Sequence, residues 1–249
     1  MSVTTLTYAL LFYAATAIFL AGLAFKISQY WTTPTPLKIP VTPAPLTKAG
    51  VVMRLAWEVL FFRSLFFSNK WTWLFGVLFH ASLLLIVIRH LRYFIRPDWF
   101  WIVLAQPFGM YAGFSLVLGL LGLWARRLFV DRVRYVSSLS DHLMLILIIA
   151  IGLSGLSLRY LTRTDIVQVK VFFLGLLRFN IQPLPEDPML LLHLGLVIAL
   201  IIVFPFSKLL HAPGIFFHPS RNQVDDAREK RHLADWAKPL DAGRDKLRE

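Results

Sequence analysis

The chain of 249 residues contains no cysteine. This absence excludes disulfide bonds, cysteine-ligated iron–sulfur clusters and the thioether attachment of c-type haem. Charge is also scarce, because Asp, Glu, Lys and Arg make up 16% of the chain, against about 25% of an average soluble domain. A redox centre in this protein would therefore depend on other side chains, and histidine is the main candidate.

Long apolar runs fill most of the chain, which is 57% hydrophobic. A helix needs about 20 residues to cross a hydrocarbon core of about 30 Å, and it satisfies its own backbone groups in lipid. We therefore predict an all-α integral membrane bundle of five transmembrane helices in residues 1–213, followed by a tail in residues 214–249. The predicted spans are Leu6–Ser28, Trp71–Phe94, Phe108–Phe129, His142–Tyr160 and Met189–Leu210.

Basic side chains gather on one side of the predicted membrane. Of the 26 lysine and arginine residues, 19 lie in the first loop, the third loop and the tail. By the positive-inside rule these segments are cytoplasmic, which places the N-terminus outside and the C-terminus in the cytoplasm. The net charge of +12 therefore reflects topology and contact with anionic membrane lipid, and it does not indicate nucleic-acid binding.

Three features refine this topology. Val51–Phe67 is apolar but carries three charged residues, so it is predicted to be an interfacial helix before the second span. Val169–Asn180 is predicted to be a shorter counterpart on the outer face. Pro97 and Pro107 are expected to bracket the loop after the second span, because proline disrupts helix interiors.

Four histidines fall within the predicted spans. His80 and His90 are ten residues apart on the second span, and His193 and His211 are 18 residues apart on the fifth. These spacings correspond to about 15 Å and about 27 Å of helix, the second being five whole turns. Because the two spans are antiparallel, His80 and His211 lie near the cytoplasm, while His90 and His193 lie nearer the outside. Two imidazoles at each of two depths suit two haem groups ligated axially from opposite sides.

The residues alone leave alternatives open. The histidines could be packing or interfacial residues satisfied by backbone carbonyls or lipid headgroups. A zinc site would need three or four ligands at one depth, and the pattern supplies two. His142, which opens the fourth span beside Asp141, is expected at the headgroups and not on a metal.

Several motifs together resemble one family along most of the chain. They are "FHASLLLIVIRH", "MYAGFSLVLGLLGLWARRLF", "RVRYVSSLSDHLMLILIIAIGLSGL" and "HLGLVIALIIVFPFSKLLH". With these motifs the chain resembles the cytochrome b gamma subunit of respiratory nitrate reductase. The resemblance implies two haem b groups in a prokaryotic cytoplasmic (inner) membrane, one held by His80 and His211 and the other by His90 and His193. It also implies electron transfer between membrane quinone and a cytoplasmic iron–sulfur partner.

The two ends of the chain depart from the nitrate reductase subunit. The first loop "TTPTPLKIPVTPAP" is longer, and the tail "HPSRNQVDDAREKRHLADW" is similar to that of the M subunit of the membrane complex associated with dissimilatory sulfite reductase. This branch implies a heterodisulfide-reductase-like iron–sulfur partner, other membrane and periplasmic subunits, and a role in sulfur metabolism. The tail, with Trp236, is the expected docking segment. The alternatives are a nitrate reductase gamma subunit proper and, in another class, a haem-free membrane anchor or transporter.

We expect the chain to be an electron-transfer subunit of an oxidoreductase complex. Whether it has quinol/quinone oxidoreductase activity of its own is left open by the sequence. Menaquinone or ubiquinone is expected beside the outer haem, among His90, Arg92 and Gln106. Arginines are candidates to pair with haem propionates, although for any single one a role in topology and contact with lipid phosphate is the preferred explanation. These are Arg54, Arg126, Arg127 and Arg134 on the inner side, and Arg89, Arg92 and Arg159 on the outer side.

Overall fold

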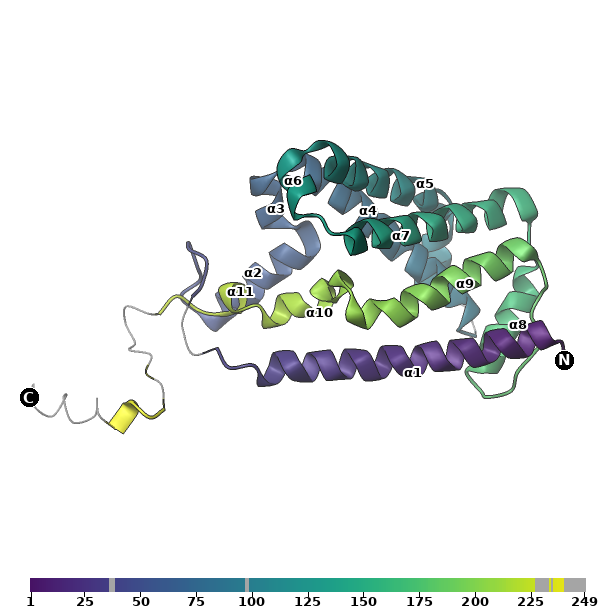
Figure 1. Ribbon diagram of the computed structural model, residues 1–249, viewed down its shortest axis with the longest axis horizontal. Helices are drawn as coiled ribbons and strands as arrows, with labels where there is room; N and C mark the ends of the chain where they lie inside the picture. Colours follow the sequence, from purple (N-terminus) through teal and green to yellow (C-terminus); the bar gives the residue numbers. More distant parts are fainter. Residues whose placement is uncertain (36–38, 97–98, 227–232, 234, 240–249) are drawn as a thin grey trace, which may run out of the picture. The chain divides into compact units, whose positions relative to one another are not determined.

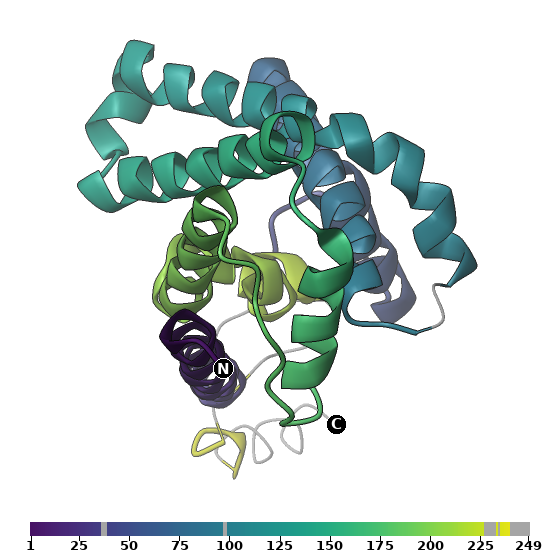
Figure 2. The same ribbon diagram turned by 90° about the vertical axis from the view of Figure 1, so that its right-hand side faces the viewer.

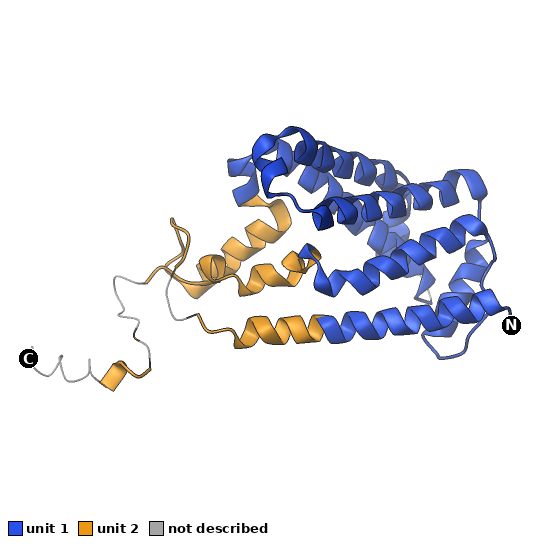
Figure 3. Ribbon diagram, viewed as in Figure 1, with its two compact units in different colours: residues 1–22, 64–208 blue, residues 23–63, 209–249 orange. Residues whose placement is uncertain are grey.

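The computed structural model describes residues 1–35, 39–96, 99–226, 233 and 235–239. Every regular element within these residues is a helix. The chain divides into two compact units, the first made of Met1–Gly22 and Ser64–Lys208, the second of Leu23–Arg63 and Leu209–Glu249 (Figure 3). Pro97 and the tail residues 227–232, 234 and 240–249, on which some of the predictions rest, lie outside the described residues.

Five helices are long and apolar enough to cross a membrane (Figure 1). They are α1 (Val3–Thr32), α4 (Lys70–His90), α5 (Phe100–Phe129), α7 (Leu139–Ser157) and α9 (Pro188–Val203), and short turns extend α4 to Tyr93, α7 to Thr162 and α9 to Phe206. Leu84, Leu118 and Leu153 are each at least half exposed on these helices, as contact with lipid requires. The prediction of five apolar spans is confirmed, and the chain is a multi-pass membrane protein.

Polar side chains begin these helices where the apolar runs start. The side chain of Asn69 accepts a hydrogen bond from the backbone N–H of Thr72 at 2.8 Å, ahead of α4. Asp187 accepts one from the N–H of Met189 at 2.9 Å, and Pro188 is the first residue of α9. Each cap satisfies a backbone donor that the helix itself leaves unpaired. Local sequence therefore sets where these spans begin.

The third span begins earlier than predicted. Helix α5 starts at Phe100, and Pro107 lies inside it, so the prediction that Pro107 ends a loop was wrong. A proline removes one backbone hydrogen bond, and membrane helices tolerate that loss. The apolar side chains from Phe100 to Ala105 continue the surface that lipid favours, so the helix extends through the proline.

The fifth span is shorter than predicted and is not one continuous helix. Helix α9 ends at Val203, the turn η3 (Phe204–Phe206) contains Pro205, and Ser207 is extended with φ −115° and ψ 173°. The short turns η4 (Lys208–Leu210) and α10 (His211–Gly214) follow. Because the helix is interrupted at Pro205, His193 and His211 are not joined by the five unbroken turns that their spacing predicted.

The two predicted amphipathic segments also differ in detail. The first is two helices, α2 (Lys48–Phe61) and α3 (Arg63–Ser68), because Phe62 between them is left-handed with φ 48°. The second is α8 (Ile166–Leu176). It ends before the predicted Asn180, because the chain reverses at Phe179, which is also left-handed with φ 55°.

The helices of the first unit pack in chain order, α4 on α5, α5 on α7 and α7 on α9 (Figures 1 and 2). Glycine permits the closest of these approaches. A Cβ atom at Gly119 on α5 would lie 2.9 Å from the backbone nitrogen of Phe79 and 3.0 Å from the carbonyl oxygen of Phe75, both on α4. Small residues at helix crossings are typical of membrane bundles, where close backbone packing replaces the hydrophobic effect.

The buried core of the first unit lies between the first half of α1, α8 and α9. Ala9 and Phe172 are fully buried in it, and Phe12 packs edge-to-face on Phe173 with ring centroids 5.3 Å apart. The Tyr8 hydroxyl of α1 donates to the Leu191 carbonyl on α9 at 2.9 Å. Hydrogen bonds of this kind tie helices together where no hydrophobic driving force acts between them.

In the second unit, the segment after α1 pairs with the short helix α11 (Pro219–Asn222). The backbone N–H of Val41 donates to the carbonyl of Ser220 at 3.0 Å, and Arg221 forms an ion pair with Glu58 of α2 at 3.1 Å. Arg54, one turn before Glu58, donates to the Val41 carbonyl at 2.8 Å. Burial, and then the charge of Arg221, lower the pKa of the Arg54 guanidinium from its ordinary value.

Candidate functional site

The structure brings two of the four predicted histidine ligands together. His90 is the last residue of α4, and His193 lies in the second turn of α9. Both belong to the first unit, and the two imidazoles are near enough for their charges to interact. His80 also lies on α4, whereas His211 opens α10 in the second unit. The pairing of His80 with His211 therefore stays a prediction.

The two histidines of α4 are held in the same protonation state. Nδ1 of His80 lies 2.8 Å from the carbonyl oxygen of Gly76, and Nδ1 of His90 lies 2.7 Å from that of Ile86. A carbonyl oxygen carries no proton, so Nδ1 is the donor in both bonds. In a neutral imidazole the lone pair is then on Nε2, the atom that a metal would bind.

His193 reaches this state through a neighbouring helix. Its Nδ1 lies 2.9 Å from Oγ of Ser154 on α7, and the Ser154 hydroxyl donates its one proton to the carbonyl of Ile151 at 3.0 Å. With its proton on the Ile151 carbonyl, Ser154 accepts the Nδ1 proton of His193, which leaves the lone pair on Nε2. Ser154 is buried, and it was not among the predicted site residues. Its polar side chain within an apolar run is the one signal that the sequence carries.

Gly155, which follows Ser154 on α7, leaves space for the imidazole of His193 because it has no side chain. A Cβ atom at Gly155 would lie 3.3 Å from Cε1 of His193, closer than packed carbon atoms prefer. Ser154 and Gly155 of α7 together form a recess for the ring, one by its hydrogen bond and the other by its small size.

His142 is held in the opposite way. The indole N–H of Trp124 on α5 donates to Nδ1 of His142 at 3.1 Å. Because indole can only donate, Nδ1 of His142 carries the lone pair, and Nε2 carries the proton of the neutral ring. This state differs from that of His80, His90 and His193, and the absence of His142 from any metal site stays a prediction.

The residues predicted to contact quinone lie on adjoining segments. Arg92 donates to the side-chain oxygen of Gln106 on α5 at 3.0 Å. Its guanidinium also lies 5.3 Å from the centre of the Tyr93 ring, and that ring is 5.8 Å from the imidazole of His90. Polar donors beside aromatic surface suit a ring with two carbonyl groups, and quinone binding here stays a prediction.

Several arginines predicted to pair with haem propionates have partners within the protein. Arg159 donates to the sulfur of Met110 at 3.0 Å, and Arg134 forms an ion pair with Asp131 at 3.1 Å. Arg127 lies 3.7 Å from Asp141, a buried carboxylate that also accepts from Lys208 at 2.7 Å. The Lys208–Asp141 pair was missed in the sequence because the two residues are far apart in the chain.

Within the described ranges, no three or more histidine, aspartate or glutamate side chains gather as they would around a metal bound by protein alone.

Comparison with known proteins gives a consistent result. Residues 50–224 match the nitrate reductase gamma subunit family. The chain is 36% identical to the Hdr-like menaquinol oxidoreductase cytochrome b-like subunit of Archaeoglobus fulgidus, over 90% of this chain and 81% of that protein. The subunit of the same description from Archaeoglobus profundus is 33% identical, over 90% of this chain and 80% of that protein. The resemblance inferred from the motifs is therefore confirmed.

Proposed function

Because the chain belongs to the nitrate reductase gamma subunit family, we propose that it is a dihaem b-type cytochrome that carries electrons between membrane quinone and a cytoplasmic iron–sulfur protein. One observation carries this proposal. Three of the four predicted ligand histidines hold their proton on Nδ1 through a hydrogen bond, which presents Nε2 to a metal, and His142 does not.

Four histidines would supply the ligands of two haem groups. His90 and His193 would hold the outer haem, and His80 and His211 the inner haem. A haem held by two histidines would supply one-electron transfer and would leave no position for substrate. The protein's part is to orient the imidazoles through Nδ1 and to keep the surroundings dry and apolar. Ser154 orients the His193 imidazole by its hydrogen bond, and Gly155 leaves room for the ring.

Menaquinone is the proposed quinone, because both relatives are named as menaquinol oxidoreductase subunits. It would bind among His90, Arg92 and Gln106, where the hydrogen bond between Arg92 and Gln106 supports a polar contact for a quinone carbonyl. The N-terminus would lie outside the prokaryotic cytoplasmic membrane and the tail in the cytoplasm, as the distribution of lysine and arginine favours.

The proposed partner is a heterodisulfide-reductase-like iron–sulfur subunit within a sulfur-metabolism complex that has other membrane and periplasmic subunits. The description of the relatives as Hdr-like supports this choice over a nitrate reductase partner. Affinity purification from native membrane, with identification of the co-purified proteins, separates the two. Recovery of a nitrate reductase catalytic subunit would overturn the heterodisulfide-reductase-like assignment.

The number of haem groups tests the proposal directly. Two pairs of ligands imply two haem b groups per chain, so a pyridine haemochrome assay on fully loaded protein should give a ratio of two. The dithionite-reduced spectrum should show a b-type alpha band. A ratio of one haem per chain would mean that one of the two proposed histidine pairs does not bind haem. The absence of the alpha band would favour the haem-free anchor or transporter.

The tail is predicted to hold the cytoplasmic partner. Deleting residues 227–249 should release that partner and leave the haem content unchanged, because no predicted ligand lies beyond His211. This deletion retains the Arg221–Glu58 ion pair of the second unit. Trp236, which is exposed, provides a finer test, and Trp236→Ala should weaken the same interaction. If the partner stays bound after the deletion, the docking segment lies elsewhere.

Ser154→Ala should alter one haem selectively. The substitution removes the acceptor of the Nδ1 proton, which makes the His193 imidazole a weaker electron donor and should raise the midpoint potential of the haem that it binds. The other haem should keep its potential. Ser154→Thr retains a hydroxyl and should stay close to the wild type. A redox titration followed at the alpha band measures both values, and equal shifts in the two haems would contradict this role.

A further inference from the structure

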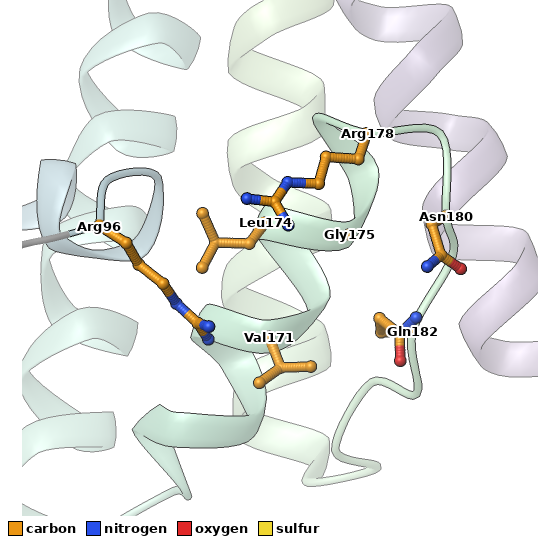
Figure 4. A pocket seen from close by; sticks show the side chains of 7 residues that line it. All are labelled: Arg96, Val171, Leu174, Gly175, Arg178, Asn180 and Gln182. Carbon is orange, nitrogen blue, oxygen red and sulfur yellow. The ribbon is translucent and has the colours of Figure 1, made fainter.

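A small pocket lies beside the last turn of α8, in the first unit (Figure 4). Its volume is about 150 Å³. Its lining comes from α8 itself, from the segment that follows α8 and from the turn after α4, and it consists of Val171, Leu174, Gly175, Arg178, Asn180, Gln182 and Arg96. None of the residues predicted to bind haem or quinone lines this pocket.

The lining carries two positive charges and no negative one. Arg96 and Arg178 come from different parts of the chain, and the other five residues are apolar or neutral. Within the part of the chain that the structure describes, neither guanidinium forms an ion pair. Two like charges beside one pocket repel each other unless an anion lies between them. A guanidinium is also the side chain whose geometry best matches phosphate oxygens.

Local backbone geometry builds this pocket. The chain reverses at Phe179, and the backbone N–H of Asn180 donates to the carbonyl of Gly175 at 2.9 Å. Glycine is needed at 175 because a Cβ atom there would clash with the backbone carbonyl oxygen of Asn180. On the other side, Phe94 packs on Phe173 of α8 with ring centroids 5.1 Å apart, which holds the segment that carries Arg96.

The residues around the pocket are those of a membrane–water interface. Trp99, Phe100 and Trp101, which follow Arg96 closely in the chain, are each more than half exposed. Phe179, next to Arg178, is 84% exposed. Exposed aromatic residues gather at the headgroup level of a bilayer, and the 11 residues of α8, about 16 Å of helix, are too few to cross it. The pocket therefore lies at the depth of lipid phosphates.

We propose that this pocket binds the phosphate of an anionic phospholipid. Arg96 and Arg178 would contact the phosphate oxygens, and the side-chain amides of Asn180 and Gln182 would donate to further oxygens of the headgroup. Val171 and Leu174 would contact the first carbons of the acyl chain. Because no carboxylate lines the pocket, the ammonium of a zwitterionic headgroup has no partner there, so phosphatidylglycerol is favoured over phosphatidylcholine. The site does not depend on the proposed electron transfer.

Native mass spectrometry of the full chain tests this proposal. Delipidated protein in detergent is titrated with phosphatidylglycerol, phosphatidylcholine or inorganic phosphate. The wild type should bind phosphatidylglycerol about 10-fold more tightly than either of the others, as expected for charge-assisted hydrogen bonds to two guanidinium groups supported by apolar contact. The double variant Arg96→Gln with Arg178→Gln should lose this preference, while Arg96→Lys with Arg178→Lys should keep part of it.

Arg163→Gln is the matched control, because Arg163 is exposed just before α8 and does not line the pocket. It should bind phosphatidylglycerol as the wild type does, and circular dichroism should give the same helix content for all variants. Unchanged phosphatidylglycerol binding in the double glutamine variant would overturn the proposal, as would equal binding of phosphatidylcholine. Inorganic phosphate that binds as tightly as phosphatidylglycerol would overturn the assignment to a lipid.

Discussion

Replacing His90 or His193 with alanine should remove or convert to high spin one haem, the same one in both variants, and leave the other haem intact. Each substitution would remove one of the two histidines proposed to hold that haem. His90 and His193 are near enough to interact in the first unit, so the spectra and the haem-to-protein ratios of the two variants should match. Reduced-minus-oxidised spectra and electron paramagnetic resonance would measure the loss.

Alanine variants of the proposed inner pair, His80 and His211, should also have spectra that match each other. His80→Ala and His211→Ala should both affect the other haem, and in them the outer haem should still be reduced by quinol while electrons stall before the cytoplasmic partner. His142→Ala should retain both haems, because its Nδ1 accepts from Trp124 and its ring does not present Nε2 as a ligand. If His90→Ala matched His211→Ala, the pairing by depth would be wrong, and with it the predicted topology.

Gly119→Ala should destabilise the helix bundle even though the change adds one methyl group. The new Cβ would lie about 3 Å from two backbone atoms of α4. A side chain could relieve the clash by changing its rotamer, but backbone atoms cannot. Helices α4 and α5 must therefore move apart where they are in contact. Overpacking of this kind costs about 1–3 kcal/mol. His80 follows Phe79 at the point of contact, so the occupancy of the haem that His80 is proposed to bind should fall as well.

Gly195→Ala on α9 is the matched control, because its Cβ would meet only the Tyr8 hydroxyl at 3.7 Å, an ordinary contact. Both substitutions gain the same helix propensity, about 1 kcal/mol, so their difference isolates the cost of the clash. Thermal unfolding in detergent, followed by circular dichroism, should give a lower midpoint for Gly119→Ala. Equal midpoints would mean that α4 and α5 can move apart without loss.

Much of this protein could be predicted from its sequence because lipid imposes simple rules. A span must be apolar, helical and about 20 residues long, so composition alone located five helices. Caps such as Asn69 and Asp187 are local, and they mark where α4 and α9 begin. The motifs around His80, His90, His193 and His211 were sufficient to indicate the family. The spacing of these histidines along the chain is a property of the sequence and does not depend on how the helices pack.

Tertiary structure decided what depends on neighbours. Proline has opposite outcomes at two sites: Pro107 continues α5, whereas Pro205 lies where α9 ends. The protonation state of His193 depends on Ser154, 39 residues earlier in the chain, and that of His142 depends on Trp124. A hydrogen bond between helices gives no repeating pattern in the sequence, because it requires only one polar residue at the position where the two helices cross. Composition and spacing therefore determined the spans and the candidate ligands, and only the packing of α7 on α9 decided which ring nitrogen of His193 lies against Ser154.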